Sequence, residues 1–142
     1  MSASRVSDPH PATGSSLRVG IDLVRVPEVR DSVRAHGDRY LERVYTEREI
    51  ADCRTADGEI APERLAARFA AKEAAITALR PAGTAVPWRT VEVRRDPGGW
   101  VELALSAQAA ERAAEAGLRH FALSLTHEGE YASAVVVAQP GE

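Results

Sequence analysis

Residues 64–79 read RLAARFAAKEAAITAL, and the rest of the chain is organised around this stretch. Pro62 suits the first position of a helix and Pro81 stops the run, while alanine and leucine supply helix propensity between them. Bulky apolar side chains recur at helical spacing, namely Leu65, Phe69, Ile76 and Leu79. The sequence therefore predicts one long helix whose apolar stripe faces a core.

Two charged residues on this helix need an explanation. Glu73 lies on the apolar stripe, where a carboxylate must be paired, protonated or bound to a cation, because burying it alone costs roughly several kcal/mol. The alternative is a boundary residue whose stem packs while its carboxylate reaches water. Lys72 is the only lysine among the 18 basic residues, which indicates that a compact ammonium is needed here.

Length and composition limit the class of protein. A chain of 142 residues and 15.3 kDa forms one domain with a real core. The net charge of −3 argues against general nucleic-acid binding, and the single cysteine, Cys53, excludes an internal disulfide and suits a reducing compartment. No apolar run approaches the ~18 residues of a membrane span, and no secretory signal is present. We expect a cytoplasmic protein without a membrane partner, with residues 1–16 as a disordered leader and 17–142 as the domain.

The other elements are predicted in an order of helices first and hairpins last. Residues 17–24 read as a strand, and Thr46 and Glu49 form a capping-box pattern that starts a helix. Gly117 ends a helix that Ser106 caps. The expected helices are 27–36, 47–54 and 107–116, and residues 39–45 are expected to form a short helix or a turn. The first expected hairpin pairs 88–95 with 100–105. The second pairs 121–125 with 131–138 through a connection at 127–130. The order β-α-α-α-β-β-α-β-β predicts an α+β fold with helices packed on a mostly antiparallel sheet.

A second carboxylate, Asp22, lies inside the apolar run of the first strand, where aspartate is depleted. An Asx-turn or a helix cap at the strand end is the alternative reading. If Asp22 and Glu73 converge, their repulsion requires a divalent cation, and oxygen ligands without a cysteine or histidine cluster favour Mg²⁺. Lys72 and Arg68 suit phosphate charge. The residues thus predict a Mg²⁺-dependent site for a phosphate or diphosphate substrate.

Other catalytic signatures are weak or missing. The chain has no Walker loop and no Gly-x-Gly-x-x-Gly fingerprint. Ser124 and His127 are close in sequence, but such a pair without an orienting acid is weak evidence for a nucleophile. His127 has a second interpretation as a turn histidine.

Three motifs resemble the holo-acyl-carrier-protein synthase type of 4′-phosphopantetheinyl transferase. They are Gly20-Ile21-Asp22, RFAAKEA at 68–74 and SLTHE at 124–128, and residues 39–49 resemble the second helical segment of that family. The resemblance covers residues 17–138 in order, and the length resembles the small single-unit class. It implies transfer of 4′-phosphopantetheine from coenzyme A to a serine of an apo acyl carrier protein, with release of adenosine 3′,5′-bisphosphate.

The resemblance also implies roles for particular residues. Asp22 and Glu73 would hold Mg²⁺ on the diphosphate, Lys72 would contact the phosphates, and Arg68 and His127 would lie near the 3′-phosphate of coenzyme A. Glu73 and a metal-bound water both stay open as acceptor of the serine proton. Members of this class are similar in forming trimers with the site between neighbouring subunits, so a homotrimer is expected.

The chain departs from the family pattern at three places. Thr77 replaces a commonly found second lysine, Glu28 replaces a common basic residue, and residues 98–100 read Gly-Gly-Trp where Gly-x-Pro is usual. These changes leave the metal pair intact and bear on carrier-protein specificity.

Arginines near the first helix bear on the same partner. Arg25, Arg30 and Arg34 form either a basic patch for an acidic carrier helix or a solvated helix face. The competing functions are a catalytically weakened module that binds coenzyme A or carrier domains, and a Mg²⁺-dependent phosphohydrolase.

Overall fold

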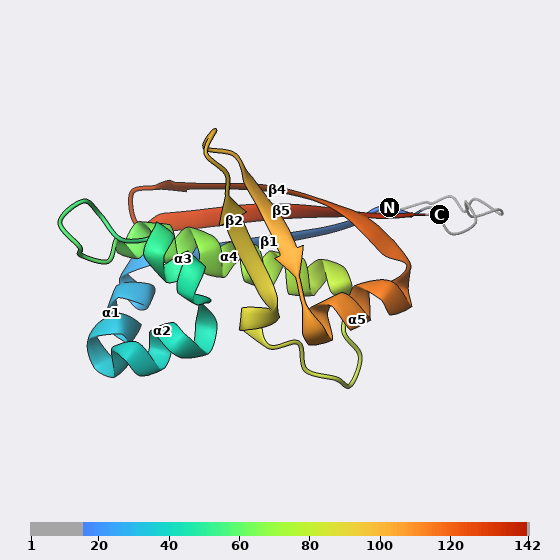
Figure 1. The fold of residues 1–142 in the computed structure, drawn as a ribbon, viewed down its shortest axis with the longest axis horizontal. Helices are drawn as coiled ribbons and strands as arrows, with labels where there is room; N and C mark the ends of the chain where they lie inside the picture. The colour runs from blue at the N-terminus through green and yellow to red at the C-terminus, as the bar shows by residue number, and fades with distance from the viewer. Residues whose placement is uncertain (1–15, 142) are drawn as a thin grey trace, which may run out of the picture.

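A computed structural model describes residues 16–141 of the chain. The elements in chain order are β1 Arg18–Arg25, α1 Val26–His36, α2 Asp38–Val44, α3 Glu47–Asp52, α4 Pro62–Leu79, the 3₁₀ turn η1 Trp88–Thr90, β2 Val91–Arg95, β3 Val101–Leu105, α5 Ala107–Ala116, β4 Leu118–Glu128 and β5 Tyr131–Pro140 (Figure 1). The predicted long helix and both predicted hairpins are present. The predicted leader lies outside the described residues, except for Ser16.

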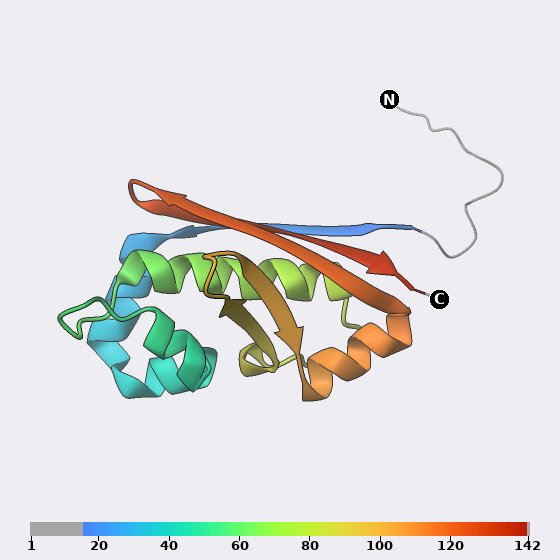
Figure 2. The ribbon, with the colours of Figure 1, turned by 45° about the horizontal axis from the view of Figure 1, so that its top comes forward.

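The elements form layers on the two sides of α4. The antiparallel sheet β1-β5-β4 covers one side, and the β2–β3 hairpin, α5 and the cluster α1–α3 lie on the other side (Figure 2). The predicted α+β class is confirmed. The described strands are all antiparallel and form a three-stranded sheet and a separate two-stranded hairpin.

Helix α4 is enclosed because its alanines allow neighbours to approach on several sides. Leu65, Leu79 and the alanines at 66, 67, 70, 71, 74, 75 and 78 are all buried. Phe69, Glu73 and Ile76 are only partly buried, so the predicted stripe is wrong in part. Alanines thus make up most of the buried surface of this helix. A helix that is apolar nearly all round is typically buried in the core.

Gly20 brings β1 unusually close to α4. A Cβ added at Gly20 would lie 1.9 Å from the carbonyl oxygen of Ala74 and 3.1 Å from the backbone nitrogen of Ala78. Only glycine leaves room for such a backbone approach. Since Asp22 follows Gly20 on the same face of β1 and Glu73 precedes Ala74 in α4, this contact positions the two carboxylates beside each other.

Several local predictions need correction. Residues 88–90 form a 3₁₀ turn instead of the start of a strand, because strand pairing begins only at Val91 opposite Leu105. Strand β4 extends through His127 to Glu128, so His127 is paired with Ala132 and is not a turn residue. The side chain of Ser106 makes no capping hydrogen bond to α5, although Gly117 ends that helix in the left-handed conformation.

The predicted capping box at Thr46 and Glu49 is confirmed, and residues 38–44 form a helix, so four helices precede the hairpin. Within residues 16–141, none of the helices combines the length and the apolar character needed to span a membrane. The cytoplasmic location stays a prediction.

Candidate metal and phosphate site

Asp22 lies in the middle of β1, on the face of the sheet that packs against α4. It is paired with Ala134 of β5 and is partly buried, and its backbone carbonyl accepts a hydrogen bond from Ser133 Oγ at 3.0 Å. Burial and then the nearby Glu73 carboxylate raise the pKa of Asp22 above its usual value, and a hydrogen bond with the Leu23 backbone partly opposes them. The alternative reading as a turn or cap residue was wrong, because β1 continues to Arg25 and Arg25 is the N-cap of α1.

Glu73 projects from the middle of α4 and is held by an aromatic partner. The indole nitrogen of Trp88 donates a hydrogen bond of 2.6 Å to Glu73 Oε2. The Trp88 ring also packs against Phe69, with centroids 5.8 Å apart and planes at 49°. Glu73 is therefore partly buried and its carboxylate is hydrogen-bonded. This carboxylate is more constrained than that of a solvated boundary residue.

Two carboxylates whose charges repel each other fit one small, hard cation. Among residues 16–141 no group of three or more His, Cys, Asp or Glu side chains surrounds a common point, so the pair would act without a third such side chain. Mg²⁺ typically takes one or two carboxylates and completes its octahedron with water and substrate phosphate. The donor set at Asp22 and Glu73 thus fits Mg²⁺ with a phosphorylated ligand, and fits zinc poorly.

Lys72 is not available to a ligand in this structure. Its side chain is fully buried, and Nζ lies 2.6 Å from Glu49 Oε1 and donates to the carbonyl oxygens of Val91 at 2.6 Å and Trp88 at 3.1 Å. Burial lowers the pKa of Lys72, and the Glu49 carboxylate opposes this effect. The predicted contact of Lys72 with phosphate conflicts with this position, because all three of its donors are used inside the protein.

Arg68 lies one turn before Lys72 and is 4% exposed. Its Nη1 donates a long hydrogen bond of 3.4 Å to the carbonyl oxygen of Arg64, and its Nε is buried without a partner in the described part of the chain. The Arg68 charge lies close enough to Cys53 to oppose the effect of burial, which raises the pKa of that thiol to about 11. A buried guanidinium without an anionic partner can donate hydrogen bonds to an anionic group of a ligand.

His127 lies on the same face of the three-stranded sheet as Asp22, but two strands away. Asp22 is opposite Ala134 of β5, and His127 is opposite Ala132, which lies two residues earlier in the same strand. Two strand spacings of about 4.8 Å and one two-residue step of about 6.8 Å place the Cα atoms of Asp22 and His127 about 12 Å apart. The fold thus brings Asp22 and Glu73 together and leaves His127 at the margin of the site.

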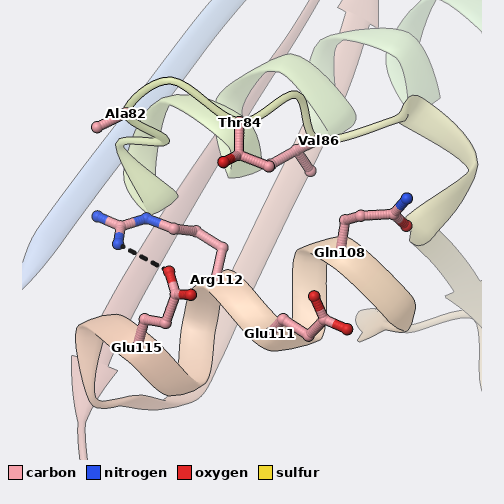
Figure 3. Close-up of a pocket in the computed structure, with 7 residues that line it drawn as sticks. All are labelled: Ala82, Thr84, Val86, Gln108, Glu111, Arg112 and Glu115. Carbon is pink, nitrogen blue, oxygen red and sulfur yellow. Dashed lines mark hydrogen bonds and ion pairs between the residues drawn. The ribbon is translucent and has the colours of Figure 1, made fainter.

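Three hollows on the described part of the surface are lined by neither Asp22 nor Glu73. One, between α5 and the loop before η1, is lined by Ala82, Thr84, Val86, Gln108, Glu111, Arg112 and Glu115 (Figure 3). There the Arg112 guanidinium donates at 2.9 Å to the carbonyl oxygens of Leu79 and Arg80 at the end of α4. Arg112 thus stabilises the C-terminus of α4, which is a structural role.

Two further hollows are basic and border the helices α1 and α2. Arg39, Arg43 and Arg89 line one of them, and Arg30, Arg34 and Arg54 line the other. Both are open to solvent and suit an acidic surface better than an apolar ligand.

Comparison with known proteins identifies the family. The model of the 4′-phosphopantetheinyl transferase superfamily matches residues 18–136. The chain belongs to this superfamily. It is similar to holo-[acyl-carrier-protein] synthases from Koribacter versatilis (42% identity, covering 87% of this chain and 98% of the relative) and Chloroflexus aurantiacus (43%, 86% and 97%). The predicted holo-acyl-carrier-protein synthase type of transferase is therefore confirmed.

Solved structures of this transferase type share the fold. The coenzyme A complex of the enzyme from Chronobacterium ammoniagenes matches with a TM-score of 0.77 and 30% identity, over 89% of this chain and 99% of that one. The Mycobacterium tuberculosis acyl carrier protein synthase matches with a TM-score of 0.68 and 34% identity, over 87% and 97%. The Helicobacter pylori enzyme, in complex with coenzyme A, matches at 0.73 and 26%, over 84% and 98%.

Sequence reasoning about this transferase missed Trp88 and the second role of Glu49. Trp88 was assigned only to a strand, and Glu49 only to the capping box. In the structure Glu49 Oε1 accepts from the Thr46 backbone nitrogen, while Glu49 Oε2 accepts from the Val93 backbone nitrogen at 2.7 Å. The only available signal was the single lysine, which required a buried acidic partner once it was placed inside the protein.

Proposed function

We propose that the protein transfers 4′-phosphopantetheine from coenzyme A to a serine of an apo acyl carrier protein, depends on Mg²⁺ and releases adenosine 3′,5′-bisphosphate. The observation that carries the proposal is the close approach of β1 to α4 at Gly20 and Ala74, which puts Asp22 beside Glu73. Relatives with the same fold have been solved with coenzyme A, which contains the diphosphate that such a pair would need to complete a Mg²⁺ shell.

The carboxylates of Asp22 and Glu73 would supply the protein ligands of Mg²⁺. When bound, the ion neutralises charge on the diphosphate and orients the phosphorus atom that the serine attacks. The protein contributes a fixed geometry, because Gly20 holds β1 against α4 and Trp88 holds the Glu73 head. Glu73 and a metal-bound water both remain candidates for accepting the serine proton.

Arg68 and His127 are proposed to bind the 3′-phosphate of coenzyme A. The unpartnered Nε of Arg68 supports its part, because a buried donor without an acceptor is costly unless a ligand supplies one. His127 is exposed and about 12 Å from Asp22 by strand spacing, a separation compatible with a 3′-phosphate on the far side of the nucleotide. Lys72 is not proposed to contact phosphate, because its ammonium is buried against Glu49, Val91 and Trp88.

The acyl carrier protein would dock on the arginines of α1 and its neighbours. Arg30 and Arg34, four residues apart on α1, share a hollow with Arg54. Arg25, by contrast, lies 3.8 Å from Glu28 and 3.9 Å from Glu130 and is partly neutralised by them. The patch that suits an acidic helix is thus Arg30, Arg34 and Arg54, shifted along the helix from the position that Glu28 occupies.

A homotrimer would cover an apolar face of β1. Four apolar side chains on this face are 57–66% exposed, namely Leu17, Val19, Ile21 and Leu23. They project from the opposite side of the chain to Asp22. Val137 and Val135 lie opposite Val19 and Ile21, so the apolar face continues onto β5. An exposed face of this kind marks a protein interface. Asp22 projects from the other face of β1, toward α4, so a subunit covering this apolar face would lie across the sheet from Asp22.

The test is incubation of the full-length protein with coenzyme A, MgCl₂ and a panel of apo carrier proteins, followed by intact-mass spectrometry. We expect the mass of at least one carrier protein to increase by one phosphopantetheine group. We expect no such increase with Glu73→Gln or after chelation of Mg²⁺. Coenzyme A binding without transfer would favour the weakened binding module, and diphosphate cleavage without a carrier would favour a phosphohydrolase. Full activity of Glu73→Gln would remove the metal assignment.

A further inference from the structure

Trp88 is bonded to two successive residues of α4 through two different parts of its structure. Its backbone carbonyl accepts a hydrogen bond from Lys72 Nζ at 3.1 Å, and its indole nitrogen donates to Glu73 Oε2 at 2.6 Å. Successive residues of a helix point about 100° apart, so a single partner rarely meets both. Trp88, the first residue of η1, contacts both because its carbonyl oxygen bonds to Lys72 and its indole nitrogen bonds to Glu73.

The backbone end of Trp88 is fixed by a buried network. Lys72 and Glu49 form an ion pair of 2.6 Å in which both side chains are fully buried. The same ammonium donates to the Val91 carbonyl, and Glu49 accepts from the Val93 nitrogen, so η1 and the start of β2 are joined to α3 and α4. Breaking such a network is costly, which makes the position of the Trp88 backbone rigid.

The ring end of Trp88 fixes one oxygen of Glu73. An indole N–H is a donor only, and its bond to a charged carboxylate is short and directional. The ring cannot turn away freely, because it packs against Phe69. In the described residues Glu73 Oε1 accepts no hydrogen bond, so the carboxylate is held by Oε2 and Oε1 is left for a ligand.

We propose that Trp88 is a positioning residue for the metal site, and that the Lys72–Glu49 pair acts through it. This inference rests on the proposed function, in which Glu73 is a Mg²⁺ ligand. Partners that orient a ligating carboxylate typically change metal affinity or activity about 10–100-fold when they are lost. The lysine of the long helix is thereby assigned to holding the turn that orients Glu73, instead of to the phosphates.

The test compares Trp88→Phe, which keeps a ring beside Phe69 but loses the donor, with Trp100→Phe. Trp100 is the only other tryptophan and is 77% exposed in the hairpin turn. Titration of Mg²⁺ in the presence of coenzyme A, followed by calorimetry, should show an affinity about 10–100-fold weaker for Trp88→Phe and unchanged for Trp100→Phe. Unchanged Mg²⁺ affinity in folded Trp88→Phe, judged by circular dichroism, would overturn the proposal.

A second measurement does not depend on the folding of Trp88→Phe. In full-length Trp100→Phe the only indole N–H resonance belongs to Trp88, and its bond to a carboxylate should shift the proton downfield. Adding Glu73→Gln should move this resonance upfield, and adding MgCl₂ with coenzyme A should also move it. A resonance that Glu73→Gln leaves in place refutes the contact. Mg²⁺ binding without transfer to any carrier contradicts the proposed function but leaves this inference standing, whereas no Mg²⁺ binding by the wild type contradicts both.

Discussion

Replacement of Gly20 by alanine tests how the fold brings the two carboxylates together. The added methyl group would lie 1.9 Å from the Ala74 carbonyl oxygen, whereas ordinary contact begins near 3.4 Å. β1 and α4 must therefore separate by about 1.5 Å, since the obstacle is backbone and cannot rotate away. Overpacking of this kind costs about 1–3 kcal/mol, and we expect about 3 kcal/mol here, which lowers Tm by roughly 10 °C.

The measurement is thermal and urea unfolding followed by circular dichroism, with Gly98→Ala as the matched control. Gly98 lies in the exposed hairpin turn, and a Cβ there meets its nearest atoms at 3.4 Å, so its replacement should change stability by less than about 0.5 kcal/mol. Gly20→Ala should also weaken Mg²⁺ binding, because it moves Asp22 away from Glu73. Equal stability of the two variants would refute the claimed close approach of β1 to α4.

Three other properties follow from the same structure. Lys72→Met should lower the free energy of unfolding by about 3–5 kcal/mol, because it leaves the Glu49 carboxylate buried without its partner, and a loss below about 1 kcal/mol in urea unfolding would contradict the buried pair. The Cys53 thiol is fully buried and its pKa is raised to about 11, so at pH 8 a thiol reagent should modify it only in denaturant. Rapid reaction of the native protein would contradict the burial of Cys53 at the end of α3. Ile21→Glu should shift the protein to a smaller mass in light scattering, whereas an unchanged mass would argue against association through the face of β1.

The secondary structure could be predicted because its boundaries carry local signals. Pro62 and Pro81 bracket α4, and Gly117 ends α5 in the conformation that glycine adopts most easily. The capping box at Thr46 was predicted because both of its members follow a fixed spacing. Such signals depend only on residues within a few positions of each other.

The faces of α4 could not be predicted in the same way. A stripe of bulky residues normally marks the core side, but in α4 the alanines make the closest contacts because Gly20 admits the backbone of β1. Phe69 is only partly buried, since it packs beside Trp88 at the edge of the site. Which side of an alanine-rich helix meets a sheet depends on the partner strand, and this information lies far away in the sequence.

The sequence singles out the two acidic residues of the candidate site but does not reveal the buried partner of its lysine. Asp22 and Glu73 stand out because a carboxylate in an apolar run is costly and needs a reason. Lys72 was assigned to phosphate because its partner, Glu49, is 23 positions earlier and already had a role in a capping box. Trp88 carried no pattern of its own, since a single hydrogen bond from an indole nitrogen leaves no mark on sequence spacing.

The central claim is that Asp22 and Glu73 together hold Mg²⁺ for the diphosphate of coenzyme A. It is tested most directly by calorimetric titration of Mg²⁺ into the protein with coenzyme A, for the wild type, Asp22→Asn, Glu73→Gln and the exposed control Glu115→Gln. We expect one Mg²⁺ per active site for the wild type and the control, and a loss of affinity beyond about 100-fold in each of the other two variants. Wild-type Mg²⁺ affinity in either Asp22→Asn or Glu73→Gln would contradict it.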